Sequence, residues 1–433
     1  MRLQSPRLHS RSLPLPYTNE TLLAGIRELA SEITSRAAEF EAGRRIPQDL
    51  IDRLRSIGMF RIFVPRSHGG LELPLPAGLE VITALARLDG SVGWTSMIAC
   101  GSGLFATLLP RGTYDRIYQG GPDVAICGSA QPAGTAEPVA GGFQINGRWP
   151  FASGCMHADW IGAVCKVVKD GKPVVDAHGK PMTRGFMIPA SDWTIEDSWY
   201  ATGLKGTGSH HITLRDALVP ETNMLDIENG TACVPGPLYQ AFRYFLPLLH
   251  GAFSVGMVVG TVDELVALAN TGRQQLYAPT PIRESETFQF ELGRISAGAR
   301  AAQAFHKVQA ADHWDHALSG TLRGEGLLLD GTQSAVWIVT TCAGVAGGCF
   351  ALGGSSALYE TSPLQRRLRD LHVAAQHVVA QQRQYTNVGK QVLQRSTDEA
   401  AQISEQAGAM CYDRGTSQQN RETGHGDGEA AIR

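Results

Sequence analysis

A fourteen-residue stretch, GRWPFASGCMHADW at 147–160, gathers side chains that could do chemistry: two tryptophans, a phenylalanine, a serine, a cysteine and a histidine. Cys155 and His157 could suggest a metal, but they supply only half of a closed site, and no cluster of further ligands lies nearby in the sequence. Ser153 with His157 could suggest a nucleophile and its base, but a G-x-S-x-G turn is missing. The sequence therefore predicts no metal site. Two interpretations stay open: core aromatics at a strand end, or the wall of a pocket for a planar ring.

The pocket interpretation has a chemical basis around Ser153. The isoalloxazine ring of a flavin needs an apolar, aromatic face and a few polar partners at its edge. Trp149 and Phe151 could form such a face. Ser153 offers a hydroxyl group, and Gly154 offers a backbone that a ring can approach closely. We therefore predict that these four residues contact a flavin.

A second segment, GGSSALYETSPLQRRLRDLHVAAQH from Gly353, also holds candidate groups. Gly353 and Gly354 suit a close approach of the backbone to a phosphate or a ring. On a helix, Asp370 and His377 share a face, whereas His372 and His377 are five residues apart and do not line up. A solvated, charged helix face would explain the arginines of this segment equally well.

The composition is that of an ordinary globular chain. It has 433 residues, of which 43% are hydrophobic and 18% charged, and a net charge of −3 without blocks of like charge. Nothing electrostatic therefore points to nucleic acid or a membrane surface. The eight cysteines show no CxxC spacing, which favours free thiols in a reducing compartment. Because no apolar leader and no apolar run of about 20 residues stands out, we expect a cytoplasmic protein that binds neither nucleic acid nor a membrane.

Three segments of different periodicity would have to position these groups. Apolar residues recur at helical spacing in the first part, with Pro47 suited to a first helical turn, Gly58 to a stop, and a break at Asp89. Short β-branched and aromatic runs between turn dipeptides then predict strands. The helical period returns afterwards, with four stretches long enough for a bundle: 249–270, 287–318, 325–350 and 364–394. The predicted parts are a disordered N-terminus (1–17), a helical domain (18–120), a β-barrel or sandwich domain (121–232), a four-helix bundle (233–410) and a disordered tail (411–433).

Taken together and in this order, the segments resemble the acyl-CoA dehydrogenase superfamily over about 18–396. The clearest matches are GLKGTGSHHITLRDALVPETNML and the segment from Gly353. Within the superfamily, GRWPFASGCMHADW is similar to the flavin-dependent monooxygenase branch, which includes the oxygenase components of two-component hydroxylases. The resemblance implies an α+β, mostly helical fold with an N-terminal helical domain, a small antiparallel β-domain and a C-terminal four-helix bundle.

The resemblance also separates two reactions. Dehydrogenases of the superfamily remove an α-proton with a glutamate, commonly in a pattern like R-D-A-K-x-x-x-I-Y-E-G-T. Arg369-Asp370 matches the start of this pattern, but the glutamate position holds Val378. The other family location for the base is the first bundle helix, and no glutamate occurs between Glu228 and Glu264. The missing bases favour a monooxygenase. An acyl-CoA dehydrogenase that uses FAD and an atypical base is the alternative, and a flavin-binding homologue without catalysis is a third.

For a monooxygenase, the resemblance implies that a separate reductase supplies reduced FMN. The flavin adds O2 at its C4a carbon, and the hydroperoxide hydroxylates an aromatic or other small organic substrate. Ser153 is implied in a hydrogen bond to flavin N5. His377 is implied near the peroxide and the substrate, where a neutral imidazole can exchange a proton. His372 stays open as the alternative histidine, and FAD as the alternative flavin.

Four further residues are implied in the pocket. Trp94 matches a tryptophan that lines the flavin or substrate site, and Ser129 a small residue that faces the flavin. Ser102 stands where aromatic hydroxylases of the branch often carry a substrate-contacting histidine, and Phe105 is predicted to contact substrate beside it. This departure indicates a different substrate pocket. The resemblance further implies a homotetramer that assembles through the C-terminal bundle.

Overall fold

The first part of the chain is helical, as its periodicity predicted. The computed structural model describes residues 18–240, 242–322 and 324–394. Asp89 separates two helices and caps the second, because its Oδ1 accepts the backbone N–H groups of Ser91 (2.8 Å) and Val92 (3.0 Å). The break predicted at Asp89 is thus confirmed. The helices are α1 (Asn19–Ser35), α2 (Ala37–Gly43), α3 (Gln48–Ser56), α4 (Leu75–Leu88), α5 (Gly90–Ala106) and α6 (Arg111–Ile117).

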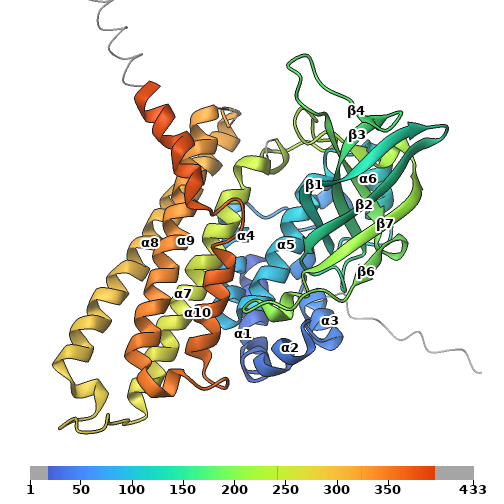
Figure 1. The fold of residues 1–433 in the computed structure, drawn as a ribbon. Helices are drawn as coiled ribbons and strands as arrows, with labels where there is room; N and C mark the ends of the chain where they lie inside the picture. Colours follow the sequence, from blue (N-terminus) through green and yellow to red (C-terminus); the bar gives the residue numbers. More distant parts are fainter. Residues whose placement is uncertain (1–17, 241, 323, 395–433) are drawn as a thin grey trace, which may run out of the picture. The chain divides into compact units, whose positions relative to one another are not determined.

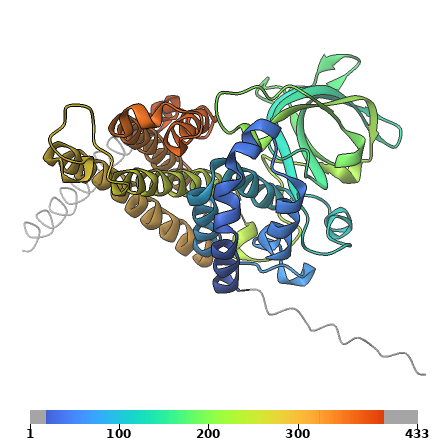
Figure 2. The same ribbon diagram turned by 90° about the horizontal axis from the view of Figure 1, so that it is seen from below.

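The middle of the chain forms a curled sheet with the strand order β6-β7-β2-β1-β3-β5-β8, and β4 pairs with β3 (Figure 2). Its strands are β1 (Ile126–Val139), β2 (Gly142–Ala152), β3 (Trp160–Lys169), β4 (Lys172–Pro173), β5 (Thr183–Pro189), β6 (Thr194–Glu196), β7 (His210–Val219) and β8 (Met224–Leu225). The prediction of a purely antiparallel sheet is wrong at one place, because β1 and β3 are parallel. The β1–β2 hairpin fills one side of β1, so the chain crosses to the other side and runs there in the direction of β1.

The last part of the chain contains the bundle helices α7 (Leu246–Asn270), α8 (Glu286–Ser319), α9 (Glu325–Gly353) and α10 (Pro363–Ala374). α7 packs against α9 and α10 and also against α4, while α8 packs on α9 (Figure 1). The fourth helix was predicted to run over 364–394, but α10 ends at Ala374. The chain then makes turns, in which His377 N donates to Ala374 O (3.1 Å). The β-branched pair Val378-Val379 lowers the local helix propensity at this place.

Two helical stretches, Phe242–Asn270 and Gly326–Ala357, are long and apolar enough by length and composition to cross a membrane. In the first, 83% of the most apolar window is buried against the rest of the chain, which is typical of the core helix of a folded domain. In the second the share is 50%. The expectation that no such stretch exists is therefore wrong, because charged residues are few in these stretches and the interspersed glycine, serine and threonine lower the mean hydropathy little.

Residues 18–381 belong to one compact unit, and the described residues from Gln382 onward belong to a second. The two termini predicted to be disordered, 1–17 and 411–433, lie outside the described residues. The predicted domain boundaries at 120 and 232 stay predictions. The helix-to-strand change itself lies between Ile117, where α6 ends, and Ile126, where β1 begins.

Candidate active site

Ser153 lies just after β2, where the chain leaves the sheet and turns inward. The register between β2 and β7 shifts between Trp149 and Ala152, which marks an irregularity in the strand. Phe151 and Gly154 both have left-handed backbone angles, with φ of +63° and +77°. Gly154 N donates to Thr207 O at 2.9 Å, so the turn is fixed against the loop before β7. As a result the Ser153 side chain is buried, with 6% exposed.

The hydroxyl group of Ser153 has two partners inside the protein. The indole N–H of Trp94, on α5, donates to Ser153 Oγ at 3.1 Å. Ser209 Oγ lies 2.7 Å from Ser153 Oγ on the other side. The structure thus joins Ser153 and Trp94, two residues that the sequence placed in one pocket only through the family resemblance.

Two histidines pack against the ring of Trp94. His250, on α7, has its ring centroid 5.3 Å from that of Trp94, and His377, after α10, has its centroid at 5.8 Å. The two imidazoles stack on each other with 4.2 Å between centroids and 28° between planes. Phe253 completes the group with an edge contact to Trp94 at 5.1 Å. Side chains from α5, α7, the end of β2 and the turn after α10 therefore meet at one place.

Burial keeps both imidazoles uncharged. It lowers the pKa of His377 from 6.5 to about 4. It also lowers the pKa of His250 well below 6.5, and the neighbouring His377 adds to this effect. Near neutral pH each ring therefore has one nitrogen that can accept a proton and one that can donate a proton.

His250 was not predicted as a site residue from the sequence. One sequence feature could have identified it: His250 is a lone titratable residue in the apolar run LPLLHGAFSVG. A lone histidine in a helix is nevertheless common in protein cores, and its partner His377 is distant in the sequence. Only the packing of α7 beside α10 shows that the two rings stack.

The other aromatic residues predicted as a flavin wall lie apart from this group. Trp149 is completely buried in the core of the sheet, where its indole N–H donates to Val164 O (2.7 Å) and its ring packs on Trp193. Phe151 is 63% exposed, and its ring lies near that of Trp199, at 6.4 Å. In a regular strand Trp149 and Phe151 would share a face. The register shift between Trp149 and Ala152 and the positive φ of Phe151 turn the two side chains apart.

Three further predicted residues, Ser102, Phe105 and Ser129, lie on α5 and β1. Ser102 and Phe105 lie on α5, the helix that carries Trp94, and the Phe105 ring is 4.1 Å from that of Phe242. Ser129 is partly buried in β1, opposite Ala163 of β3.

Gly353, Gly354 and His372 are not brought to Ser153 in this chain. Arg273, which follows α7, donates to Gly353 O and to Ser355 Oγ. This places the glycine pair at the end of α7 opposite to His250, roughly 30 Å along the helix at 1.5 Å per residue. His372 is exposed on α10. Of the two histidines that the sequence left open, His377 is thus the one that contacts Trp94.

Cys155 and His157, the pair that could suggest a metal, have separate partners. Cys155 Sγ donates to Gly208 O at 3.4 Å, and His157 Nδ1 lies 3.2 Å from Gln48 Oε1. Among the residues described, no group of three or more histidines, cysteines and carboxylates is arranged to hold a metal ion.

The cluster fits the reactive part of a flavin. Ser153 can still form a further hydrogen bond, and Thr95 has a buried Oγ1 without a hydrogen-bond partner. Both residues line a cavity of about 10 Å³, which has room for one water molecule. A flavin ring is far larger, so this cavity belongs to the surroundings of the hydroxyl groups and is not the position of the ring. Polar groups at an edge, beside the apolar rings of Trp94 and Phe253, are what an isoalloxazine requires.

Comparison with known proteins agrees with this geometry. The family models of the acyl-CoA dehydrogenase N-terminal and C-terminal domains match residues 18–115 and 248–382. The chain is 32% identical over 380 residues to indole-3-acetate monooxygenase of Pseudomonas putida, which covers 86% of this chain and 92% of the relative. The chain belongs to the acyl-CoA dehydrogenase family.

Two further relatives fall in the monooxygenase branch of the acyl-CoA dehydrogenase family. The oxygenase subunit HsaA of a flavin-dependent monooxygenase from Mycobacterium tuberculosis is 27% identical, over 83% of this chain and 91% of its own length. The structure of XiaF from a Streptomyces species in complex with FADH2 and glycerol has a TM-score of 0.77 and 26% identity, and the match covers 84% of this chain and 92% of that one. The predicted family is confirmed, and these names support the monooxygenase prediction and a reduced flavin over the dehydrogenase alternative.

The histidine pair lies close to the two places where, by the family resemblance, dehydrogenases carry their glutamate. One place is position 378, where this chain has a valine whose side chain is 47% exposed and whose preceding residue is His377. The other place is the first bundle helix, α7, which carries His250. Two stacked, neutral imidazoles therefore lie near these places, and position 378 itself carries no carboxylate for α-proton removal.

Proposed function

We propose that this chain is the oxygenase component of a two-component monooxygenase, which uses O2 and reduced FMN to hydroxylate an aromatic or other small organic substrate. The observation that carries the proposal is the group formed by the buried Ser153, Trp94 and His250 with the partly buried His377. It offers hydrogen bonding and neutral imidazoles in place of the carboxylate of a dehydrogenase. The names of the relatives as oxygenase components support the same function and imply a flavin reductase as partner.

With flavin and substrate bound, the residues of this site would have separate roles. Reduced flavin, when bound, would supply the two electrons that activate O2, of which one atom enters the product and the other leaves as water. Ser153 and Trp94 orient the ring by a hydrogen bond and an apolar contact. The neutral ring of His377 takes the proton that the substrate loses, and His250 stacks behind it and holds its orientation. Trp94, Ser153 and His250 are each 6% exposed, so little water would reach the reacting atoms beside them.

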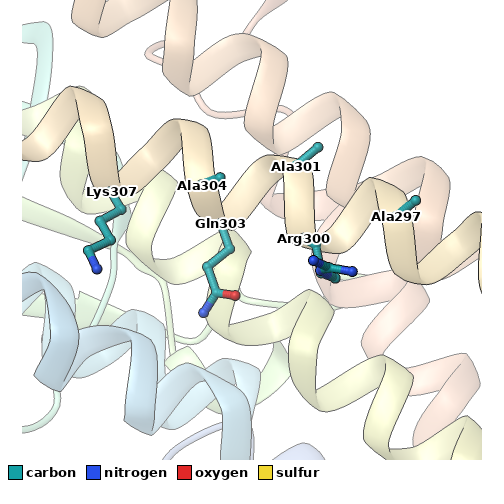
Figure 3. Close-up of a pocket in the computed structure, with 6 residues that line it drawn as sticks. All are labelled: Ala297, Arg300, Ala301, Gln303, Ala304 and Lys307. Carbon is teal, nitrogen blue, oxygen red and sulfur yellow. The ribbon is translucent and has the colours of Figure 1, made fainter.

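The flavin and the assembly are finer parts of the proposal. We take FMN as the flavin on the family resemblance, with FAD as the alternative. We also propose a homotetramer whose copies meet through α8 and α9. A broad, open hollow of about 660 Å³ runs along α8. Figure 3 shows the small and polar residues that line it: Ala297, Arg300, Ala301, Gln303, Ala304 and Lys307.

Large apolar side chains on the same two helices support such an interface. Phe290, Val308 and Leu318 on α8 are each more than 60% exposed, and Trp337 on α9 is 38% exposed. Light scattering on the purified protein is expected to give the mass of four chains. The mass of one chain would contradict the assembly.

The seven described cysteines are all free, which supports a cytoplasmic location, and cell fractionation would test that location.

The function is tested by supplying each substrate class to the purified protein. Reduced FMN or reduced FAD is prepared without oxygen and mixed with aerated buffer that contains indole-3-acetate or a simple phenol, and the products are separated by chromatography. We expect a hydroxylated product only when protein, reduced flavin and O2 are all present. A parallel assay follows reduction of an electron-accepting dye by acyl-CoA thioesters. Reduction that depends on a thioester, without any hydroxylation, would show that the chain is a dehydrogenase.

A further inference from the structure

Three buried hydroxyl groups form a continuous row that ends at Ser153. Thr207 Oγ1 lies 2.7 Å from Ser209 Oγ, and Ser209 Oγ lies 2.7 Å from Ser153 Oγ. At its other end the row meets a backbone carbonyl, because Thr207 Oγ1 is 2.7 Å from Leu204 O. The exposed fractions of Thr207, Ser209 and Ser153 are 2%, 4% and 6%. The row is therefore shielded from water, and its hydrogen bonds are made within the protein.

The direction of every hydrogen bond in this row follows from counting protons. Each of the three hydroxyl groups carries one proton, and there are three oxygen–oxygen contacts to fill. A carbonyl oxygen can only accept, so the proton of Thr207 must point to Leu204 O. Ser209 must then donate to Thr207, and Ser153 must donate to Ser209. Any other arrangement leaves two oxygens 2.7 Å apart with no proton between them, where their lone pairs repel each other.

This direction decides what Ser153 can offer to a ligand. Its proton is committed to Ser209, and one of its lone pairs receives the indole N–H of Trp94, a group that can only donate. One lone pair is left. Towards a bound molecule the Ser153 hydroxyl group is therefore an acceptor and not a donor.

A flavin differs between its two redox states at the atom that would meet this acceptor. The reduced isoalloxazine ring carries a hydrogen on N5, whereas the oxidised ring has a lone pair there. We propose that the Thr207–Ser209 row fixes the Ser153 hydroxyl group as an acceptor, so that the site selects reduced over oxidised flavin. This inference rests on the proposed function, since it requires that Ser153 faces flavin N5. Thr207 and Ser209 are positioning residues in this arrangement, because they act on the flavin only through Ser153.

Further hydrogen bonds of Leu204 hold the loop that carries this row of hydroxyl groups. Leu204 N donates to Asp370 Oδ1 on α10 at 2.5 Å, which holds the loop that carries the row. Leu204 O accepts two N–H groups besides the Thr207 hydroxyl, from Thr207 N (3.1 Å) and from the indole of Trp199 (3.0 Å). Removing the Thr207 hydroxyl group would therefore leave the carbonyl satisfied, so the fold is expected to tolerate Thr207→Val.

The test compares the affinities of the full-length protein for oxidised and reduced FMN. Oxidised FMN is titrated aerobically by fluorescence quenching, and reduced FMN is titrated under anaerobic conditions. In Thr207→Val and in Ser209→Ala, the proton of Ser153 is no longer committed, so Ser153 can donate to oxidised N5 and still accept from reduced N5. We expect oxidised FMN to bind about tenfold more tightly than to the wild-type chain, while reduced FMN changes by less than about threefold. A tenfold change in this ratio lowers the two-electron potential of bound FMN by about 30 mV.

The matched control is Thr107→Val, directly after α5. Thr107 is also fully buried, and its Oγ1 donates to Leu104 O three residues earlier at 2.6 Å, the same local pattern as in Thr207. In the Thr107→Val variant, the ratio of the affinities for oxidised and reduced FMN should equal that of the wild-type chain. Equal weakening of both flavin states in Thr207→Val and Ser209→Ala, or an unchanged ratio, would overturn the role of the row and leave the proposed function intact. A wild-type chain that binds neither state would overturn the proposed function, and this inference with it.

Discussion

The His377→Gln variant is expected to hydroxylate substrate about 10²- to 10⁴-fold more slowly than the wild-type chain, the usual contribution of a positioned acid–base group. Glutamine has a similar size and can keep a hydrogen bond, but it cannot take up a proton near neutral pH. The affinity for reduced flavin should stay nearly the same, because Ser153 and Trp94 are untouched. Single-turnover hydroxylation and an anaerobic flavin titration measure the two effects separately.

His372→Gln is the matched control for this variant. It changes the same residue type five positions earlier, where the side chain is exposed on α10. Its hydroxylation rate should equal that of the wild-type chain. If His377→Gln retains the wild-type rate, or if His372→Gln loses activity to the same degree, His377 is not the group that exchanges the proton.

The lowered pKa of His377 also sets the dependence of stability on pH. Because its pKa is about 4 in the folded chain and near 6.5 when unfolded, the unfolded chain binds the proton first as the pH falls. The unfolding free energy should therefore fall between pH 6.5 and pH 4, with at most about 3 kcal/mol from this residue. His377→Gln should show a shallower loss over the same range in urea unfolding.

The Asp370→Ala variant is expected to lower the unfolding free energy by about 2–4 kcal/mol. Asp370 is 2% exposed, and its Oδ1 accepts Leu204 N at 2.5 Å, so alanine leaves a buried N–H group without a partner. It also removes a carboxyl group that lies near the buried Arg367. Urea unfolding at neutral pH measures the change.

Asp370→Asn is expected to cost much less, because the amide oxygen can still accept Leu204 N. Burial, and then the charge of Asp89, raise the pKa of Asp370 to about 7, so near this pH the native carboxyl group is itself partly protonated. Because the pKa of Asp370 is raised in the folded chain, its protonated carboxyl group contributes fully to the unfolding free energy below about pH 4. This contribution is lost as the pH rises through 7. The stability of Asp370→Asn should therefore rise relative to that of the wild-type chain as the pH increases from about 4 to 7. A constant difference over this range would show that Asp370 does not titrate there.

An exposed aspartate provides the control for Asp370→Ala. Asp263 is about half exposed and pairs with Arg87 at 2.7 Å on the surface. Asp263→Ala should change the unfolding free energy by less than about 1 kcal/mol, because exposed ion pairs contribute little. A loss as large as that of Asp370→Ala would show that burial is not the cause.

Features that depend on neighbouring residues could be predicted from the sequence. The helix break at Asp89 depends on a side chain that caps its own next turn, and Gly58 takes the positive φ (89°) of a helix stop. The order of helices, sheet and bundle also followed from periodicity. Such signals are local, and packing did not override them.

Features that depend on distant contacts could not be predicted in this way. The parallel pairing of β1 and β3 depends on which side of β1 the chain reaches after the hairpin. Trp149 and Ser153 are four residues apart, yet an irregularity in the strand sends one side chain into the core of the sheet and the other to Trp94. The pairing of His250 with His377 depends on the packing of two bundle helices. The row from Thr207 to Ser153 appears only when the loop before β7 meets the end of β2.

The origin of the oxygen atom in the product tests the central claim most directly. The purified chain is mixed with reduced FMN, substrate and ¹⁸O2 in unlabelled water, and the product is analysed by mass spectrometry. A monooxygenase places one ¹⁸O atom in each molecule of hydroxylated product, and the Ser153–Trp94–His377 group predicts this result. A product that carries oxygen from water, or no oxygenated product together with desaturation of an acyl-CoA thioester, would contradict the account.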